Sequence, residues 1–200
     1  MKVVPLLLLA AGQSARMGEP KQLLNWGENN LIQKAMIEGS KFNLPLYTVL
    51  GAHFDKINKS INSKKYKIIH NKNWEKGIGN SISTGIKKIL NDYPILEGVL
   101  IYLVDQPLIE FSHLFRIYNS FNNKKRLVVS SYKDNKLGVP ALFGVEYLKF
   151  LIDLDSDNGA ASIIKKIYSK EKTVIVNNES YLIDLDDKKA YENFYKEFVN

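Results

Sequence analysis

Apolar runs alternate with amphipathic stretches of helix length along the first two thirds of the chain. Residues 3–9 form an unbroken apolar run, which is typical of a strand buried on both faces of a parallel sheet. Further strands are predicted at 46–50, 66–70, 98–104 and 127–131. Helices are predicted from residue 29 or 30, and over about 54–61, 80–91 and 111–121. This order predicts right-handed βαβ units and an α/β fold, a three-layer αβα, doubly wound and mostly parallel sheet.

The pattern loosens after residue 134. A strand over 138–143 carries Pro140 near its start, which predicts an edge strand or an added hairpin rather than a central strand. Helices over about 145–152 and 158–168, strands at 173–176 and 181–184, and a helix from about Asp187 complete the predicted elements. No repeat, low-complexity linker or second core interrupts residues 1–200, so a single domain is predicted.

Composition narrows the classes of site that the chain can hold. Apolar content of 45% and charged content of 24% are ordinary for a globular protein, so disorder is not expected. The absence of cysteine excludes disulfides and thiolate metal sites. The histidines are scattered at positions 53, 70 and 113, which argues against a structural zinc site.

The charge and the N-terminus each suggest an alternative that the sequence does not favour. The net charge of +7 suits a nucleic-acid partner, but the lysines are spread over the chain. We therefore expect a solvated surface that suits a polyanionic small substrate.

The first apolar run superficially resembles a signal peptide. It passes directly into a loop with Arg16 and Lys21 and is too short to span a membrane. We therefore expect a buried strand in a cytoplasmic protein with no membrane partner.

The loop after the first strand has the composition of a phosphate-binding turn. Gly12 and Gly18 allow backbone N–H groups to approach an anion, Arg16 can bind phosphate bidentately, and Lys21 supplies a point charge. The spacing fits neither GxxxxGK[ST] nor GxGxxG, so this would be a phosphate loop of another kind. An ordinary turn with surface cations is the alternative. The loops at 71–81 and 105–107 are expected at the same sheet edge, because ligands bind beyond the carboxyl ends of parallel strands.

Acidic residues at two strand ends are candidates for a metal site. Asp105 ends an apolar strand and faces the proposed phosphate loop, where a carboxylate can hold Mg²⁺ against nucleotide phosphates. Capping of the following turn is the alternative. Asp184 and Asp186 alternate at a predicted strand end and therefore share a face. One of these two carboxylates can be a second metal ligand. Alternatively, the acidic residues can cap the last helix, and the two aspartates by themselves do not distinguish between the two roles.

The first loop and several later motifs resemble one family. LLAAGQSARMGEPKQLL, at residues 8–24 with its flanking leucine, resembles the signature LAAGxSxRMGxPKxLL of the MobA-like nucleotidyltransferases that act on molybdenum cofactor. These are the molybdenum cofactor cytidylyltransferases and their guanylyltransferase relatives, within the nucleotide-diphospho-sugar transferase or pyrophosphorylase-like fold. The resemblance continues through Asn71, Trp74 and Gly77, and through the segments 105–107, 138–143, 156–160 and 184–186. It spans nearly the whole chain.

The resemblance implies a role for each matching position. It implies that the nucleotide is bound by Ala10, Ala11, Gly12, Arg16, Lys21, Asn71, Gly77 and Ser81. In this set, the backbone of residues 10–12 contacts the base and the ribose, and Arg16 and Lys21 bind the triphosphate. The same resemblance makes Arg16, Lys21 and Asp105 the catalytic residues. It assigns Mg²⁺ to Asp105 and Asp186, the favoured member of the late pair.

The resemblance also implies substrates and a reaction. Ala-Ala-Gly at 10–12, together with Asp-Gln-Pro at 105–107, is similar to the cytidylyltransferase branch and suggests CTP over GTP, because the side chain of Ala11 leaves less room beside the base. The implied reaction is Mg²⁺-dependent transfer of CMP from CTP to the phosphate of molybdopterin or molybdenum cofactor, with release of pyrophosphate. Residues 1–107 form the nucleotide half, and 108–200 form the acceptor half. A molybdoenzyme or its maturation factor is the implied partner.

The chain departs from the family pattern mainly in the acceptor half. Val139 stands where the family usually has histidine, Ala161 stands where it has arginine, and Asp187-Lys188 replaces Thr-Pro. Two alternatives therefore remain: the same transfer to a sugar or polyol phosphate, and a non-catalytic carrier that binds a nucleotide or cofactor. Retention of Arg16, Lys21 and Asp105 argues against the carrier.

Overall fold

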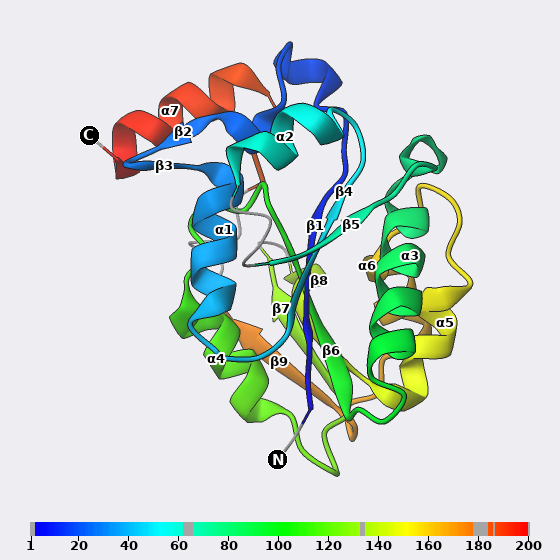
Figure 1. The fold of residues 1–200 in the computed structure, drawn as a ribbon. Helices are drawn as coiled ribbons and strands as arrows, with labels where there is room; N and C mark the ends of the chain where they lie inside the picture. Colours follow the sequence, from blue (N-terminus) through cyan, green and yellow to red (C-terminus); the bar gives the residue numbers. More distant parts are fainter. Residues whose placement is uncertain (1–2, 62–65, 133–134, 178–183, 186, 200) are drawn as a thin grey trace.

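A seven-stranded sheet forms the centre of the molecule. The computed structural model describes residues 3–61, 66–132, 135–177, 184–185 and 187–199 (Figure 1). The strand order is β5-β4-β1-β6-β8-β7-β9. The strands are β1 Leu6–Ala10, β4 Leu46–Leu50, β5 Lys67–His70, β6 Gly98–Leu103, β7 Leu127–Ser131, β8 Leu137–Gly144 and β9 Thr173–Asn177. β8 is antiparallel to both neighbours, and the other pairings in this sheet are parallel, which confirms the predicted mostly parallel α/β fold.

Helices cover both faces of this sheet. They are α1 Leu31–Ser40, α2 Phe54–Ser60, α3 Ile78–Asp92, α4 Phe111–Ser120, α5 Leu148–Ile152, α6 Ala160–Ile167 and α7 Lys188–Phe198. Figure 1 shows α3, α5 and α6 on one side of the sheet, with α1 and α4 on the other. Leu6 and Leu8 belong to the apolar core with α1 and α4, and Leu7 and Leu9 to the core with α3 and α6. Burial on both sides explains why the first strand is apolar at every position.

Short-range sequence patterns predicted several helices and loops correctly. The Asn30 side chain accepts a hydrogen bond from the Gln33 backbone N–H at 3.0 Å, and the Gln33 side chain accepts one from the Asn30 N–H at 3.1 Å. This capping box starts α1 where the asparagine predicted it. Asp187 likewise caps α7. The predicted loop 10–27 contains the 3₁₀ turns η1 Ala15–Met17 and η2 Lys21–Leu23 and a hairpin strand, β2 Asn25–Trp26, that pairs with β3 Asn29–Asn30. In the predicted strand 181–184, residues 181–183 lie outside the described residues.

The proline-containing strand is not the predicted edge strand, but the alternative prediction of a hairpin is confirmed, because β8 follows β7 in the chain and pairs with it in antiparallel fashion. β8 lies inside the sheet, between β6 and β7. Val129 pairs with Ala141 but Ser130 pairs with Gly138, so a register shift leaves Pro140 in a bulge. Because β6 pairs only with residues 141–144, no ladder hydrogen bond needs the missing N–H of Pro140.

A buried histidine links α4 to this bulge. The Ser130 hydroxyl donates to the Pro140 carbonyl oxygen at 2.6 Å, so His113 Nε2, 2.9 Å from Ser130 Oγ, must donate. His113 Nδ1 then accepts from Arg116, at 3.2 Å. Burial, with a smaller contribution from the Arg116 charge, lowers the pKa of His113 to about 4.

We expect the free energy of unfolding to fall as the pH drops from about 6.5 to about 4. Between these pH values His113 binds a proton in the unfolded chain, where its pKa is the ordinary 6.5, but stays neutral in the folded protein. The stability that is present above pH 6.5 is therefore lost as the pH falls toward 4. Urea denaturation at several pH values measures this. His113→Gln, whose amide does not titrate, should show a flatter dependence. The same slope in both proteins would contradict the assignment.

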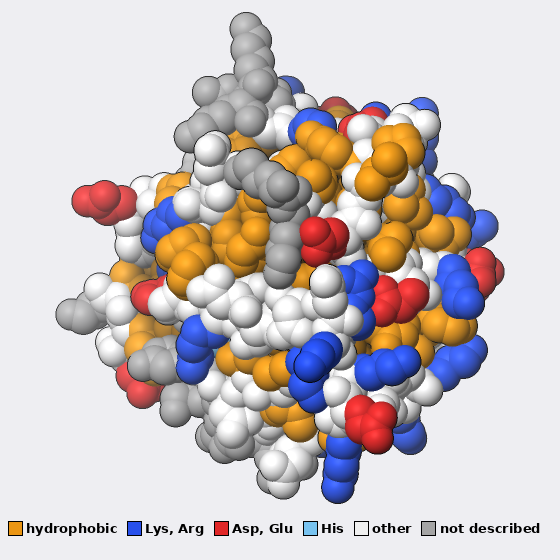
Figure 2. Space-filling model, turned by 90° about the horizontal axis from the view of Figure 1, so that it is seen from below, with side chains coloured by type: hydrophobic (Ala, Val, Ile, Leu, Met, Phe, Trp, Pro, Cys, Tyr) orange, Lys and Arg blue, Asp and Glu red, His pale blue; other side chains and the backbone are white. Residues whose placement is uncertain are grey.

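Two further observations bear on possible partners. Among the described residues, every helix is too short or too polar to span a lipid bilayer. On the face shown in Figure 2, lysine and arginine side chains are interspersed with acidic and apolar ones. They form no single basic tract on that face.

Candidate functional site

The loops that follow β1, β5 and β6 meet at the carboxyl end of the sheet around a cavity of about 370 Å³. Such an edge is where open α/β sheets bind ligands. We call this cavity the nucleotide cavity, after the ligand that the sequence predicts for it. The sequence-predicted residues that line it are Ala10, Ala11, Gly12, Lys21, Gly77, Ser81 and Asp105. Positions far apart in the sequence are thus brought to one site.

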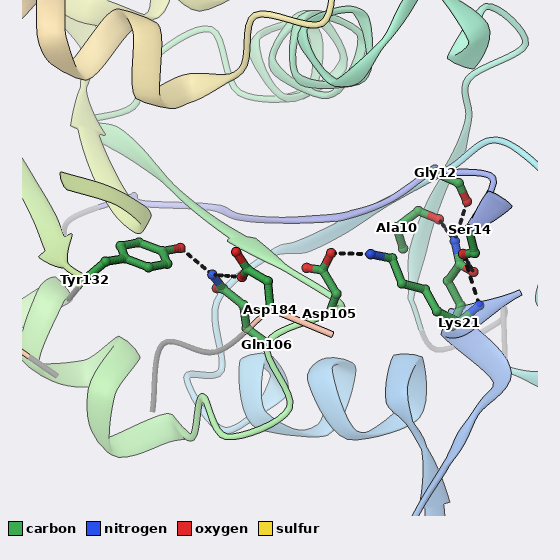
Figure 3. Close-up of polar contacts among 9 residues, drawn as sticks. Ala10, Gly12, Ser14, Lys21, Asp105, Gln106, Tyr132 and Asp184 are labelled. Atoms are coloured by element: carbon green, nitrogen blue, oxygen red, sulfur yellow. Dashed lines mark hydrogen bonds and ion pairs between the residues drawn. The ribbon is translucent and has the colours of Figure 1, made fainter. Parts of the chain in front are cut away.

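A buried glutamine holds the loop after β1. Gln22 is fully buried, and its Nε2 donates to the carbonyl oxygens of Ala10 and Gly12, both at 2.9 Å. The Ser14 hydroxyl oxygen accepts from the Lys21 backbone N–H at 3.1 Å (Figure 3). Sequence reasoning missed Gln22 because its partners lie ten and twelve positions earlier, and no local pattern marks such a contact.

Lys21 and Asp105 form an ion pair inside the cavity. Lys21 Nζ lies 2.5 Å from Asp105 Oδ2, and both side chains are less than a fifth exposed (Figure 3). Asp105 Oδ1 is buried and has no hydrogen-bond partner among the described residues. A buried carboxylate oxygen without a donor fits a divalent cation, which takes oxygen ligands. One oxygen of Asp105 can therefore bind a hard metal ion beside the lysine, and among the described residues no group of three acidic or histidine side chains surrounds it.

The second acidic segment lies directly beside the first. The Leu185 N–H donates to the Asp105 carbonyl oxygen at 3.0 Å, and Gln106 Nε2 donates to Asp184 Oδ1 at 2.9 Å. Gln106 also donates to the Tyr132 hydroxyl (Figure 3). Burial, followed by the Asp184 charge, raises the pKa of Tyr132, so its hydroxyl stays protonated and donates to the Val139 carbonyl oxygen.

Asp184 is therefore the described member of the late acidic pair that lies near Asp105. Asp186, which the resemblance favours as the second metal ligand, lies outside the described residues. The helix cap considered as an alternative is supplied by Asp187 instead. Asp184 thus does not cap α7, and its carboxylate accepts the hydrogen bond from Gln106.

Arg16 and Asn71 do not line the cavity. Arg16 is exposed on η1. Asn71 is buried; its Nδ2 donates to Ser81 Oγ at 3.0 Å, and its Oδ1 accepts from the Asn73 N–H at 3.0 Å. Asn71 thus positions Ser81, which does line the cavity.

Gly77 allows a segment near residue 157 to reach the cavity. Its φ is +99°, and a Cβ built there would lie 2.7 Å from the Asp157 backbone nitrogen. Only glycine accommodates this backbone conformation and this approach. Asp157, which sequence reasoning did not assign to the nucleotide, consequently lines the cavity.

We expect Gln22→Met to raise KM for the nucleotide about tenfold, because the Ala10 and Gly12 carbonyl groups lose their shared donor and the loop loses its shape. Steady-state kinetics measures this. Gln33→Met is the matched control: it removes a hydrogen bond of 2.8 Å to the Ser60 carbonyl oxygen far from the cavity. The control should lose stability with KM unchanged. An equal change of KM in both variants would contradict the role of Gln22.

Comparison with known proteins identifies the family. A family model described as a MobA-like NTP transferase domain matches residues 6–173, which include the β1 loop, the Lys21–Asp105 pair and all of β8. The chain belongs to this family. It is therefore a nucleotidyltransferase, and enzymes of this class use a divalent metal, for which Asp105 offers the oxygen described above.

Individual members and solved structures of similar fold extend over almost the whole chain. Nicotine blue oxidoreductase of Paenarthrobacter nicotinovorans is 26% identical over 196 residues, covering 94% of this chain and 89% of that protein. Rv0371c of Mycobacterium tuberculosis superposes with a TM-score of 0.85 at 21% identity, covering 98% of each chain. Its manganese complex gives 0.79 at 19% identity, covering 96% of this chain and 98% of that one.

A cytidylyltransferase from Leptospira borgpetersenii shares the fold as well. It superposes with a TM-score of 0.74 at 14% identity, covering 100% of this chain and 89% of that one. At these identities the structural matches show a common fold.

Proposed function

We propose that this nucleotidyltransferase transfers CMP from CTP to an acceptor phosphate, with Mg²⁺ bound at Asp105 and with release of pyrophosphate. The observation that carries the proposal is the Lys21–Asp105 pair, at 2.5 Å, in a cavity whose wall is the backbone of residues 10–12. The resemblance makes molybdopterin or molybdenum cofactor the first acceptor to test, and a molybdoenzyme or its maturation factor the recipient. A sugar or polyol phosphate is the alternative. An NTP substrate suits an enzyme of the cytoplasm.

The proposed chemistry is an in-line displacement. An oxygen of the acceptor phosphate attacks the α-phosphorus, a new P–O bond forms, and the bond to the β-phosphate oxygen breaks, so that pyrophosphate leaves with the electron pair. A phosphate oxygen is already a nucleophile, and no general base is required. Mg²⁺, when bound, would neutralise charge that develops on the phosphates. Lys21 adds a positive charge from inside the cavity, and Arg16 adds one from the exposed end of the loop.

The side chain of Ala11 supports the choice of CTP. Ala11 lines the cavity and is only 6% exposed, and its carbonyl oxygen accepts the Ala52 N–H at 3.0 Å, so the backbone that carries its methyl group is held in place at the cavity wall. We expect Ala11→Gly to shift the kcat/KM ratio of CTP to GTP about tenfold toward GTP. Ala52→Gly, which removes a methyl group outside the cavity lining, is the control. A wild-type enzyme that prefers GTP would contradict the assignment.

Pyrophosphate release tests the proposed function. The protein is incubated with each NTP, Mg²⁺, and either molybdopterin or a panel of sugar and polyol phosphates. Release with CTP and molybdopterin would support the first acceptor, and release with a sugar phosphate alone would overturn it. No release with any pair would favour a carrier.

The relative named as an oxidoreductase adds one further arm to this experiment. Reduction of nicotine blue by an added hydride donor is followed by absorbance. Turnover in this arm, with no pyrophosphate released in the others, would contradict nucleotidyl transfer as the reaction of this chain.

A further inference from the structure

Two more cavities continue from the nucleotide cavity into the acceptor half. The first, of about 340 Å³, shares Leu9, Ile78 and Leu103 with the nucleotide cavity. The second, of about 440 Å³, shares Lys136, Leu137 and Ala161 with the first. Together they form a trough, which we call the acceptor trough, that runs from the nucleotide cavity past Ala161 to Tyr168, the residue that follows α6. Its position beside the reacting phosphates makes it the place where an acceptor can lie.

The walls of the acceptor trough are mainly apolar. Side chains of Ile82, Leu137, Val139 and Ile164 line it. Two of the polar side chains in the lining already hydrogen-bond to the protein: the Tyr132 hydroxyl donates to the Val139 carbonyl oxygen, and the Asp184 carboxylate accepts from Gln106. Apart from Asp184, Lys136 and Lys165, the side chains of the lining offer an acceptor few hydrogen-bond partners.

Two lysine side chains lie along the acceptor trough, on the route by which an anionic molecule would enter or leave it. Lys136 lies at the junction of the two cavities, and Lys165 lies along the second. Their aliphatic stems can cover apolar surface while the ammonium groups stay in water. The lysine stems therefore extend the apolar lining, and their ammonium groups can attract an anionic acceptor as it enters.

Two of the three departures from the family pattern lie in this trough. Val139 and Ala161, which stand where the resemblance expects histidine and arginine, line the first cavity together, and Ala161 also lines the second. Two side chains that would hydrogen-bond or carry charge are thus replaced by apolar ones in one place. A polyol hydroxyl group that lies against Val139 and Ala161 would find no side-chain hydrogen-bond partner in them, at a cost on the order of tenfold in affinity for each such hydroxyl shielded from water.

We infer that the acceptor is a phosphate monoester with a largely apolar, extended body, such as a prenyl or alkyl phosphate, and that sugar and polyol phosphates are rejected. The inference rests on the proposed nucleotidyl transfer. The acceptor's phosphate oxygen attacks the α-phosphorus of CTP, a P–O–P linkage forms, and pyrophosphate leaves. The apolar body lies in the acceptor trough, and Val139 and Ala161 determine the specificity.

Acceptor kinetics test this inference. With CTP and Mg²⁺ held constant, kcat/KM is measured for geranyl phosphate, molybdopterin and glycerol 3-phosphate. We expect geranyl phosphate to exceed the other two by about tenfold or more. A preference for molybdopterin or glycerol 3-phosphate would overturn the inference and leave nucleotidyl transfer intact. No pyrophosphate release with any acceptor would overturn the proposed function itself, and the inference with it.

Variants at Ala161 separate binding in the trough from general damage. Ala161→Arg should lower kcat/KM for geranyl phosphate at least about tenfold, because the guanidinium occupies the junction of the two cavities. Ala161→Ser, which keeps the space, should lower it much less. Calorimetry with CTP and Mg²⁺ reports whether each variant still folds and binds nucleotide. An arginine variant that binds CTP and uses geranyl phosphate as well as the wild type would contradict the inference.

Discussion

Asp105→Asn is expected to lower kcat by roughly 100- to 1,000-fold, the range found when one electrostatic contact to a transition state is removed. Oδ2 of Asp105 holds Lys21, and Oδ1 is buried with no hydrogen-bond partner among the described residues. An amide lacks the negative charge that binds a divalent cation, and its N–H₂ group would face either the metal or the Lys21 ammonium. The variant should therefore lose both metal affinity and the orientation of the lysine.

Pyrophosphate release from CTP measures this loss, and Mn²⁺ binding followed by electron paramagnetic resonance measures the metal directly. Asp92→Asn is the matched control, because Asp92 also pairs with a lysine, Lys88 at 2.7 Å, but lies at the end of α3 outside the lining of the nucleotide cavity. Its kcat should stay near the wild-type value. Asp105→Asn with undiminished turnover would show that the metal is bound elsewhere.

Lys21→Met is the variant with the second largest expected effect. We expect kcat to fall by roughly 100-fold and KM for CTP to rise, because the cavity loses the cation that faces the triphosphate. Lys21→Arg should retain part of the activity, since it keeps the charge but changes the geometry. Lys41→Met, which breaks the pair with Glu38 at 2.7 Å outside the cavity, is the control and should leave both constants unchanged.

The double variant distinguishes one functional unit from two independent residues. If Lys21 and Asp105 act together on the same phosphates, Lys21→Met with Asp105→Asn should lose little more activity than the stronger single variant. Losses that multiply would contradict a shared role. Urea denaturation of the three proteins shows whether the buried carboxylate of Lys21→Met, left without its lysine, destabilises the fold by on the order of 1–3 kcal/mol.

The sequence by itself determined the layers of the fold and the edge that carries the site. The apolar run of β1 is readable because both faces of a parallel strand are covered, and Asn30 and Asp187 start α1 and α7 through bonds to residues three positions later. Parallel strands end at the same edge of a sheet, so the sequence alone predicted that Lys21 and Asp105 lie at one edge. These features depend on short sequence separations or on a rule that holds for every such sheet.

Contacts between distant segments were decided only by the tertiary structure. β8 lies inside the sheet because a bulge removes Pro140 from the hydrogen-bonded ladder. Arg16 is exposed because of the path of the loop that contains η1 and η2. Gln22 bonds backward to the end of β1 because packing buries it there. Val139 and Ala161 line one cavity although they lie on different elements, β8 and α6. Pattern and propensity describe neighbours in the chain, whereas the acceptor trough depends on which side chains fill the space between packed elements.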